Sequence, residues 1–170
     1  MRRRGVVVVV MMIGSLFGCG ASDSGGDEPA KAEQRADATR AAAKETFPLV
    51  GDAVKALTYT SGGSGRWAIC GMEPSPSGAE YAAEVAVTQS DTAASEQAEL
   101  IASALTSAGW KVDETTSEAV TASKGGLAFR ARYGDGGINL SITSGCVDVS
   151  KDRIRALTDE PSEDLGLPQP

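Results

Sequence analysis

The side chains that most often carry chemistry are sparse in this chain. Histidine is absent from all 170 residues, and cysteine occurs three times, as Cys19, Cys70 and Cys146. Without histidine the chain cannot build a Ser-His-Asp or Cys-His nucleophile, a histidine metal site or an imidazole pH switch. Carboxylates, arginines and cysteines are therefore the residues whose spacing matters first.

Two pairs of glutamates have the residue type that glycoside hydrolysis needs, a general acid and a second carboxylate. They are Glu114 with Glu118, and Glu73 with Glu80. Spacing along the chain does not fix the distance between two carboxyl groups, and most acidic side chains lie in solvent. The glutamates leave open one catalytic function, that of a carboxylate-dependent cell-envelope hydrolase, which is the alternative to a non-catalytic binding module. No residue is assigned a catalytic role.

No cofactor or metal ion is predicted. The glycine-rich run 61–65 precedes an expected strand, whereas a phosphate-binding loop precedes a helix. The acidic residues of segment 22–28 lack the ligand spacing of a calcium loop. Both stretches are interpreted as connecting segments.

One polar group of residues belongs to two segments of alternating hydrophobicity, 127–133 and 138–143. If the segments pair as neighbouring strands, two guanidinium groups lie beside amide and hydroxyl groups on one wet face. Guanidinium groups bind phosphate and carboxylate, so this is a candidate binding face for an anionic partner. The alternative is an ordinary solvated sheet face. The residues are Arg130, Arg132, Asn139, Ser141 and Thr143.

The chain is acidic. Its formal charge is −7, and removing residues 1–18, which contain Arg2, Arg3 and Arg4 and no acid, takes it to −10. Such a charge repels nucleic acid and anionic lipid surfaces. No other cluster of lysine or arginine is present in the sequence, so no nucleic-acid partner is expected.

Residues 1–18 have the layout of a signal peptide. Three arginines precede the apolar stretch Gly5–Phe17, whose 13 residues are fewer than the roughly 20 that a membrane-spanning helix needs. Arg3-Arg4 is compatible with twin-arginine export, but the run of valines after it favours the general secretory route.

The end of this segment, Leu16-Phe17-Gly18-Cys19, resembles a bacterial lipobox, with Phe17 where the lipobox has a small residue. The resemblance implies that signal peptidase II cuts before Cys19 and that Cys19 carries lipid. The mature chain is then anchored to the outer face of the cell membrane. Residues 19–30 form a flexible tether.

Two apolar stripes at helical spacing predict amphipathic helices. The first runs from Ala43 to Leu57, with Pro48 either in its first turn or inside a longer helix that begins near Ala30. The second runs from Ala94 to Ala108 and ends at a glycine. Alternation of period two predicts strands at 66–70, 81–88, 110–114, 119–123, 127–133 and 138–143.

Short connections between these strands predict an antiparallel sheet. The expected fold is α+β, a two-layer sandwich in which about five to six strands are covered on one face by two helices, in the order α-β-β-α-β-β-β. The folded domain covers residues 31–158. Residues 159–170, acidic and containing proline, are expected to be a disordered tail.

Cys70 and Cys146 are expected to form a disulfide. An exported protein reaches an oxidising compartment, and the lipobox resemblance implies that the third cysteine, Cys19, carries lipid. The bridge closes a loop of about 77 residues, which is worth roughly 4 kcal/mol in the chain-entropy model. Cys70 is out of phase with Trp67 and Ile69, so the bridge is expected at a strand end. A redox-active dithiol is less favoured, since Cys-x-x-Cys is absent.

Four segments between residues 66 and 147 resemble a group of small actinobacterial lipoproteins of unknown function: "WAIC", "SALTSAGWKV", "GLAFRARY" and "SGCV". The resemblance implies fold and location and assigns no catalytic residue. The predicted function is a lipid-anchored extracytoplasmic module that binds or supports an envelope protein or a cell-wall polymer without catalysis.

Overall fold

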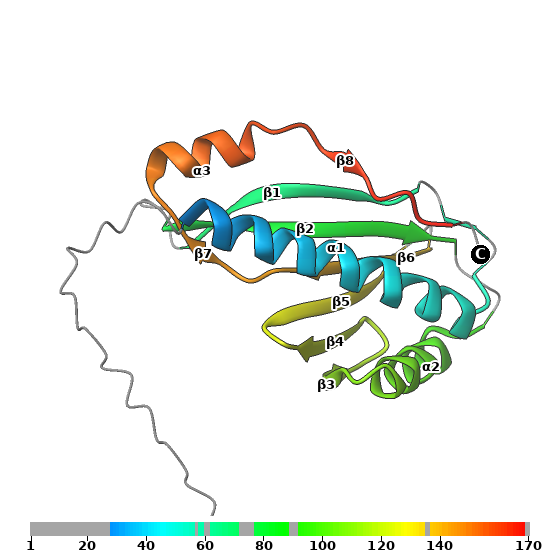
Figure 1. Cartoon of the computed structure of the whole chain (residues 1–170). Coiled ribbons are helices and arrows are strands. Elements are labelled where there is room, and N and C mark those ends of the chain that lie inside the picture. The colour runs from blue at the N-terminus through cyan, green and yellow to red at the C-terminus, as the bar shows by residue number, and fades with distance from the viewer. Residues whose placement is uncertain are drawn as a thin grey trace, which may run out of the picture.

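The helices and strands form an α+β fold, as the two hydrophobic periods predict. The computed structural model describes residues 28–56, 58–59, 62–71, 77–88, 92–134 and 137–168 (Figure 1). The elements are α1 (Glu28–Ala53), β1 (Ser64–Cys70), β2 (Gly78–Val87), α2 (Ala94–Ser107), β3 (Lys111–Thr115), β4 (Ala119–Lys124), β5 (Leu127–Gly134), β6 (Gly137–Thr143), β7 (Val147–Asp148), α3 (Lys151–Thr158) and β8 (Glu163–Asp164).

The predicted element order is wrong in its count. The sheet has eight strands, and β7, α3 and β8 follow the last strand that alternation predicts. β7 and β8 have two residues each, too few for a period to be recognised. They are strands because β2 and β1 offer unpaired backbone groups to them.

The sheet is antiparallel, with strands in the order β3-β4-β5-β6-β2-β1-β8, and β7 pairs with the start of β2. β3 to β6 are successive neighbours, and β2 lies between β6 and β1. In that position Ala83 is opposite Ile142, and Val85 is opposite Leu140. These apolar pairs face the helices and form the middle of the core.

α1 is a single helix that begins at Glu28 and contains Pro48. Of the two options predicted for this helix, the structure therefore has the longer one, with the proline inside it. Small residues on one side of the helix, Ala32, Ala36 and Ala43, are fully buried and let the helix approach the sheet. α1 packs on β2 and β6, and α2 packs on α1 and β3 (Figure 1). Leu57, assigned to this helix from sequence, lies outside the described residues.

α2 ends as its sequence predicts. Gly109 follows it with a φ of 79°, a left-handed conformation that glycine adopts without strain. The Trp110 backbone N–H then donates to the Leu105 carbonyl at 2.9 Å. The Trp110 ring turns into the core and meets Phe129 edge to face, with ring centres 5.9 Å apart.

The expected disordered tail from residue 159 differs from the structure, which describes an ordered segment as far as residue 168. β8 pairs with the first residues of β1, and Leu165 and Leu167 are only 3% and 6% exposed. The two leucines enter the core, whereas most of the acidic and proline residues, namely Asp159, Glu160, Pro161, Asp164 and Pro168, are exposed. Composition alone does not reveal that two apolar side chains of the segment are buried.

A polar cluster joins this C-terminal segment to the helix layer. The Tyr81 hydroxyl and the Arg40 Nε both donate to Oε1 of Glu163. The Arg40 guanidinium also lies 4.6 Å from the centre of the Tyr81 ring. Gly65 makes room for the cluster, because a Cβ at that position would lie 1.8 Å from the Tyr81 hydroxyl. α1, β2 and β8 are thus connected through one carboxylate.

The predicted disulfide between Cys70 and Cys146 is confirmed, with the two Cα atoms 5.7 Å apart. Cys70 is the last residue of β1, so the bridge lies at a strand end, as its phase predicts. Cys146 precedes β7 and does not end a long strand. The bridge spans 76 positions and joins the end of β1 to the segment that pairs with the start of β2.

We expect the double variant Cys70→Ser/Cys146→Ser to lose about 4 kcal/mol of unfolding free energy, because the open chain regains the entropy of a long loop. Denaturant titration measures the loss. Reduction of the wild-type chain should give the same lowered midpoint and should leave the double variant unchanged. Equal midpoints for all forms would show that the bridge contributes no stability.

A second prediction concerns Glu163 and pH. Burial favours the neutral carboxyl, but hydrogen bonds from Tyr81 and Arg40, with the charges of Arg40 and Lys44, outweigh it and lower the pKa of Glu163 below its ordinary 4.5. The carboxylate therefore stabilises the fold above pH 4.5, and this contribution is lost as pH falls through the lower folded pKa.

We expect Glu163→Gln to lower the unfolding free energy at neutral pH by about 1 kcal/mol, a modest value because 41% of the side chain is exposed. Unfolding curves of the variant and the wild type should converge in acid. Glu160→Gln, an exposed neighbour, is the matched control and should behave as wild type. A constant difference at every pH would contradict the role given to the charge.

Candidate functional site

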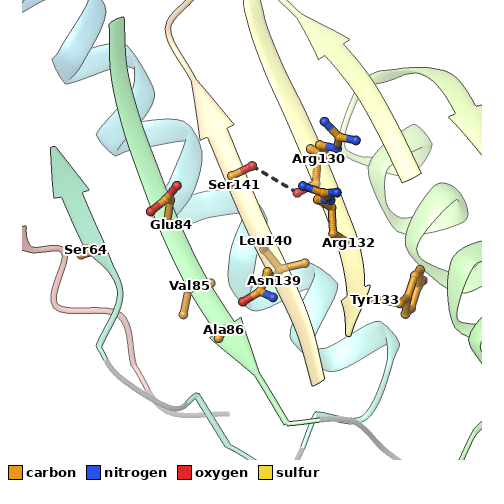
Figure 2. A pocket seen from close by; sticks show the side chains of 10 residues that line it. All are labelled: Ser64, Glu84, Val85, Ala86, Arg130, Arg132, Tyr133, Asn139, Leu140 and Ser141. Atoms are coloured by element: carbon orange, nitrogen blue, oxygen red, sulfur yellow. Dashed lines mark hydrogen bonds between the residues drawn. The ribbon is translucent and has the colours of Figure 1, made fainter. Parts of the chain in front are cut away.

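The five residues of the predicted polar face lie on two neighbouring strands. Arg130 and Arg132 are on β5, and Asn139, Ser141 and Thr143 are on β6. Arg130 is opposite Ser141, and Arg132 is opposite Asn139. Since their strand neighbours point into the core, these side chains stand on the side of the sheet away from α1, here called the open face (Figure 2).

A depression of about 720 Å³ occupies the middle of the open face. It extends over β5, β6, β2 and β1, and four of the five predicted residues line it. Thr143 is outside this lining and lies between Ala82 and Ala128 of the adjoining strands. The lining consists of Ser64, Glu84, Val85, Ala86, Arg130, Arg132, Tyr133, Asn139, Leu140 and Ser141.

Sequence reasoning missed six lining residues. Three of them, Ser64 of β1 and Glu84 and Ala86 of β2, belong to the open face. The side chains of Val85, Tyr133 and Leu140 belong to the core side of the sheet. Alternation in segment 81–88 already places Glu84 and Ala86 on a wet face. The pairing of β2 with β6 was the missing information, because more than 50 residues separate Glu84 from Ser141, its partner in the sheet. Short side chains at positions 64 and 86 leave the surface hollow between the arginines and β1.

The charges on the open face are unevenly paired. Glu84 accepts a hydrogen bond from Arg66 at 3.2 Å, so the carboxylate of the lining already has a cationic partner. Among the described residues, no carboxylate lies within 4.0 Å of Arg130 or Arg132. Both side chains are exposed. The two guanidinium groups therefore keep their donors available to a ligand.

Neutral polar groups stand next to these arginines. The Ser141 hydroxyl donates weakly to the Arg130 carbonyl at 3.5 Å, and the Asn139 amide is exposed beside Arg132 (Figure 2). Both can donate and accept. The depression therefore offers two positive charges with hydroxyl and amide groups at their side.

Tyr133, at the rim, is the aromatic residue of the lining. Burial raises the pKa of its hydroxyl to about 12, so the phenol is neutral at physiological pH. The hydroxyl is buried and has no hydrogen-bond partner among the described residues. It is thus neither an ionised base nor an exposed platform for a sugar ring.

The described carboxylates of the two predicted pairs, Glu80, Glu114 and Glu118, do not line the depression. Glu114 is on β3, and Glu118 lies in the turn before β4, both exposed. Glu80 is on β2, and Glu73 lies outside the described residues. In the described part of the chain, no group of three or more cysteine or acidic side chains could hold a metal ion.

The segment that carries the lipobox-like sequence, with Cys19 and the tether, lies outside the described residues apart from the first turn of α1. Lipid attachment at Cys19 accordingly stays a prediction. None of the helices in the described ranges is long and apolar enough to cross a membrane.

The arginines can be separated from the fold by mutation. We expect Arg130→Gln and Arg132→Gln to change the unfolding free energy by less than about 0.5 kcal/mol, because both are exposed and have no described ionic partner. Phe129→Ala, on the same strand but facing the core, should cost about 3–5 kcal/mol. Denaturant unfolding compares the three, and a large loss in either arginine variant would contradict their assignment to a surface free of structural contacts.

Comparison of the chain with protein-family models, with curated proteins and with solved structures gives no match. The depression on the open face, built by β5, β6, β2 and β1, is the candidate functional site.

Proposed function

We propose that the chain is a lipid-anchored extracytoplasmic module that binds a component of the cell envelope through its open face and catalyses no reaction. The lipid is carried by Cys19, and the domain lies at the outer side of the cell membrane. One observation carries the binding role. A hollow with two exposed arginines, which have no ionic partner among the described residues, occupies a sheet face that α1 and α2 leave uncovered.

The location is supported by the cysteines. A disulfide between Cys70 and Cys146 is compatible with an oxidising compartment outside the cytoplasm. The remaining cysteine, Cys19, ends a lipobox-like sequence that follows three arginines and an apolar stretch. The three cysteines then have two uses: Cys70 and Cys146 form the disulfide, and Cys19 carries the lipid.

Non-catalytic binding is favoured over the carboxylate-dependent hydrolase by the lining of the depression. Glycoside hydrolysis of the usual kind requires two carboxyl groups on either side of the scissile bond. Glu84 is the single carboxylate in the described lining, and Arg66 holds it in an ion pair. Of the pairs Glu114 with Glu118 and Glu73 with Glu80, the three described members, Glu114, Glu118 and Glu80, are outside this lining.

The proposal is tested in the envelope itself. A photo-crosslinking residue at position 139, on the open face, should form adducts with an envelope component, whereas the same residue at Glu99 on α2 should not. Mass spectrometry of the same preparation should find the mature chain starting at an acylated Cys19. An unmodified N-terminus at another residue would contradict the lipid anchor. Equal crosslinking from positions 139 and 99 would contradict the binding role of the open face.

A further inference from the structure

We propose that the ligand of the open face is an anionic polymer whose phosphate or carboxylate groups bind Arg130 and Arg132 together. The inference deepens the proposed function and rests on its assignment of the open face as the binding surface.

The charge of the lining favours an anion. Arg130 and Arg132 have no carboxylate of the described residues within 4.0 Å, and the ion pair with Arg66 compensates Glu84. The hollow thus carries two uncompensated positive charges, although the whole chain has a formal charge of −7. Guanidinium groups form bidentate hydrogen bonds with phosphate and carboxylate, which match their planar geometry.

The spacing of the arginines favours a ligand with repeated charges. They are two residues apart on one strand, so their side chains leave the same face roughly 6.6 Å apart. A carboxylate bound bidentately by one guanidinium has no further oxygen for the other, and a small phosphate keeps few. Successive charged groups of a polymer can occupy both at once, and the second contact then forms at high effective concentration.

The shape of the hollow is compatible with a chain-like ligand. It crosses four neighbouring strands, which corresponds to about 14 Å at the spacing of strands in a sheet, and it is open to solvent along its length. A segment bound at the arginines of β5 would pass Asn139 and Ser141 of β6 (Figure 2). It would then cross Glu84 of β2, whose charge is paired with Arg66, and reach Ser64 of β1.

The neutral groups along this path indicate what joins the charges. Asn139, Ser141 and Ser64 offer amide and hydroxyl groups, which hydrogen-bond to the hydroxyl and ether oxygens of sugars and polyols. Tyr133, with its hydroxyl buried, offers no open ring for stacking. The structure therefore points to a polyol or glycan chain bearing phosphate or carboxylate groups.

Calorimetric titration of the full chain in detergent micelles tests this. The probes are poly(glycerol phosphate) and polygalacturonate, which separate phosphate from carboxylate, with neutral dextran as the uncharged reference. We expect binding to at least one polyanion and none to dextran. Arg130→Gln and Arg132→Gln should each weaken it about tenfold. If counterion release resembles that of single-stranded nucleic acid, each should also reduce the slope of log K against log salt by roughly 0.7.

Arg155→Gln is the matched control, because it removes one exposed positive charge from α3, outside the lining. It should leave the affinity unchanged, and Arg130→Lys, which keeps the charge but not the fork of donors, should fall between wild type and Arg130→Gln. Equal affinity of wild type and the double variant Arg130→Gln/Arg132→Gln, or binding to neither polyanion, overturns the inference. A protein crosslinked from position 139 alongside a negative titration would preserve the open face as a binding surface and reject the polymer.

Discussion

Strand β2 pairs with β6 on one side and with β1 on the other, and this register decides which side chains enter the core and which meet solvent. Ala83 opposite Ile142 and Val85 opposite Leu140 belong to the helix-facing side. The same register sets Glu84 opposite Ser141 on the open face. A slip of one residue would bury the carboxylate of Glu84 and expose Val85, so the core enforces the arrangement of the open face.

Strand β1 lies near the edge of the sheet and is fastened at both of its ends. At its start, β8 pairs with Ser64 and Gly65, and Glu163 of β8 binds Arg40 and Tyr81. At its end, Cys70 is bridged to Cys146. A short edge strand held only by β2 would separate easily, because half of its backbone groups lack a partner in the sheet. The polar cluster and the disulfide act at opposite ends of this strand.

The two faces of the sheet have different roles, since one packs against the helices and the other carries the depression. The helix-facing side contains the buried apolar residues, so we expect substitutions of exposed side chains on the open face to have little effect on stability. Arg130 and Arg132 stand on a strand whose alternate residues, Phe129 and Ala131, are buried in the core. The strand therefore holds the two Cα positions, while the exposed guanidinium groups can adjust to a ligand.

Local patterns were sufficient for much of this architecture. Helical and alternating periods identified both long helices and the six longer strands, since each element needs one apolar face whatever its neighbours are. The disulfide followed from the count of three cysteines and the use proposed for Cys19. The residues after 158 were misjudged, because β8, Leu165 and Leu167 are held by contacts with β1 and the core that composition does not encode.

The sequence by itself determined the alternation that puts Arg130, Arg132, Asn139, Ser141 and Thr143 on one wet face, because side-chain direction in a strand has a period of two. Only the tertiary structure decided what lies beside them. The pairing of β6 with β2 placed Glu84 opposite Ser141 and Ala86 opposite Asn139. The pairing of β2 with β1 added Ser64, together with Arg66, which forms an ion pair with Glu84. Strand order is set by long-range burial of the apolar face, which no local period specifies. It places Arg130 and Arg132 in a hollow where no described carboxylate pairs with them.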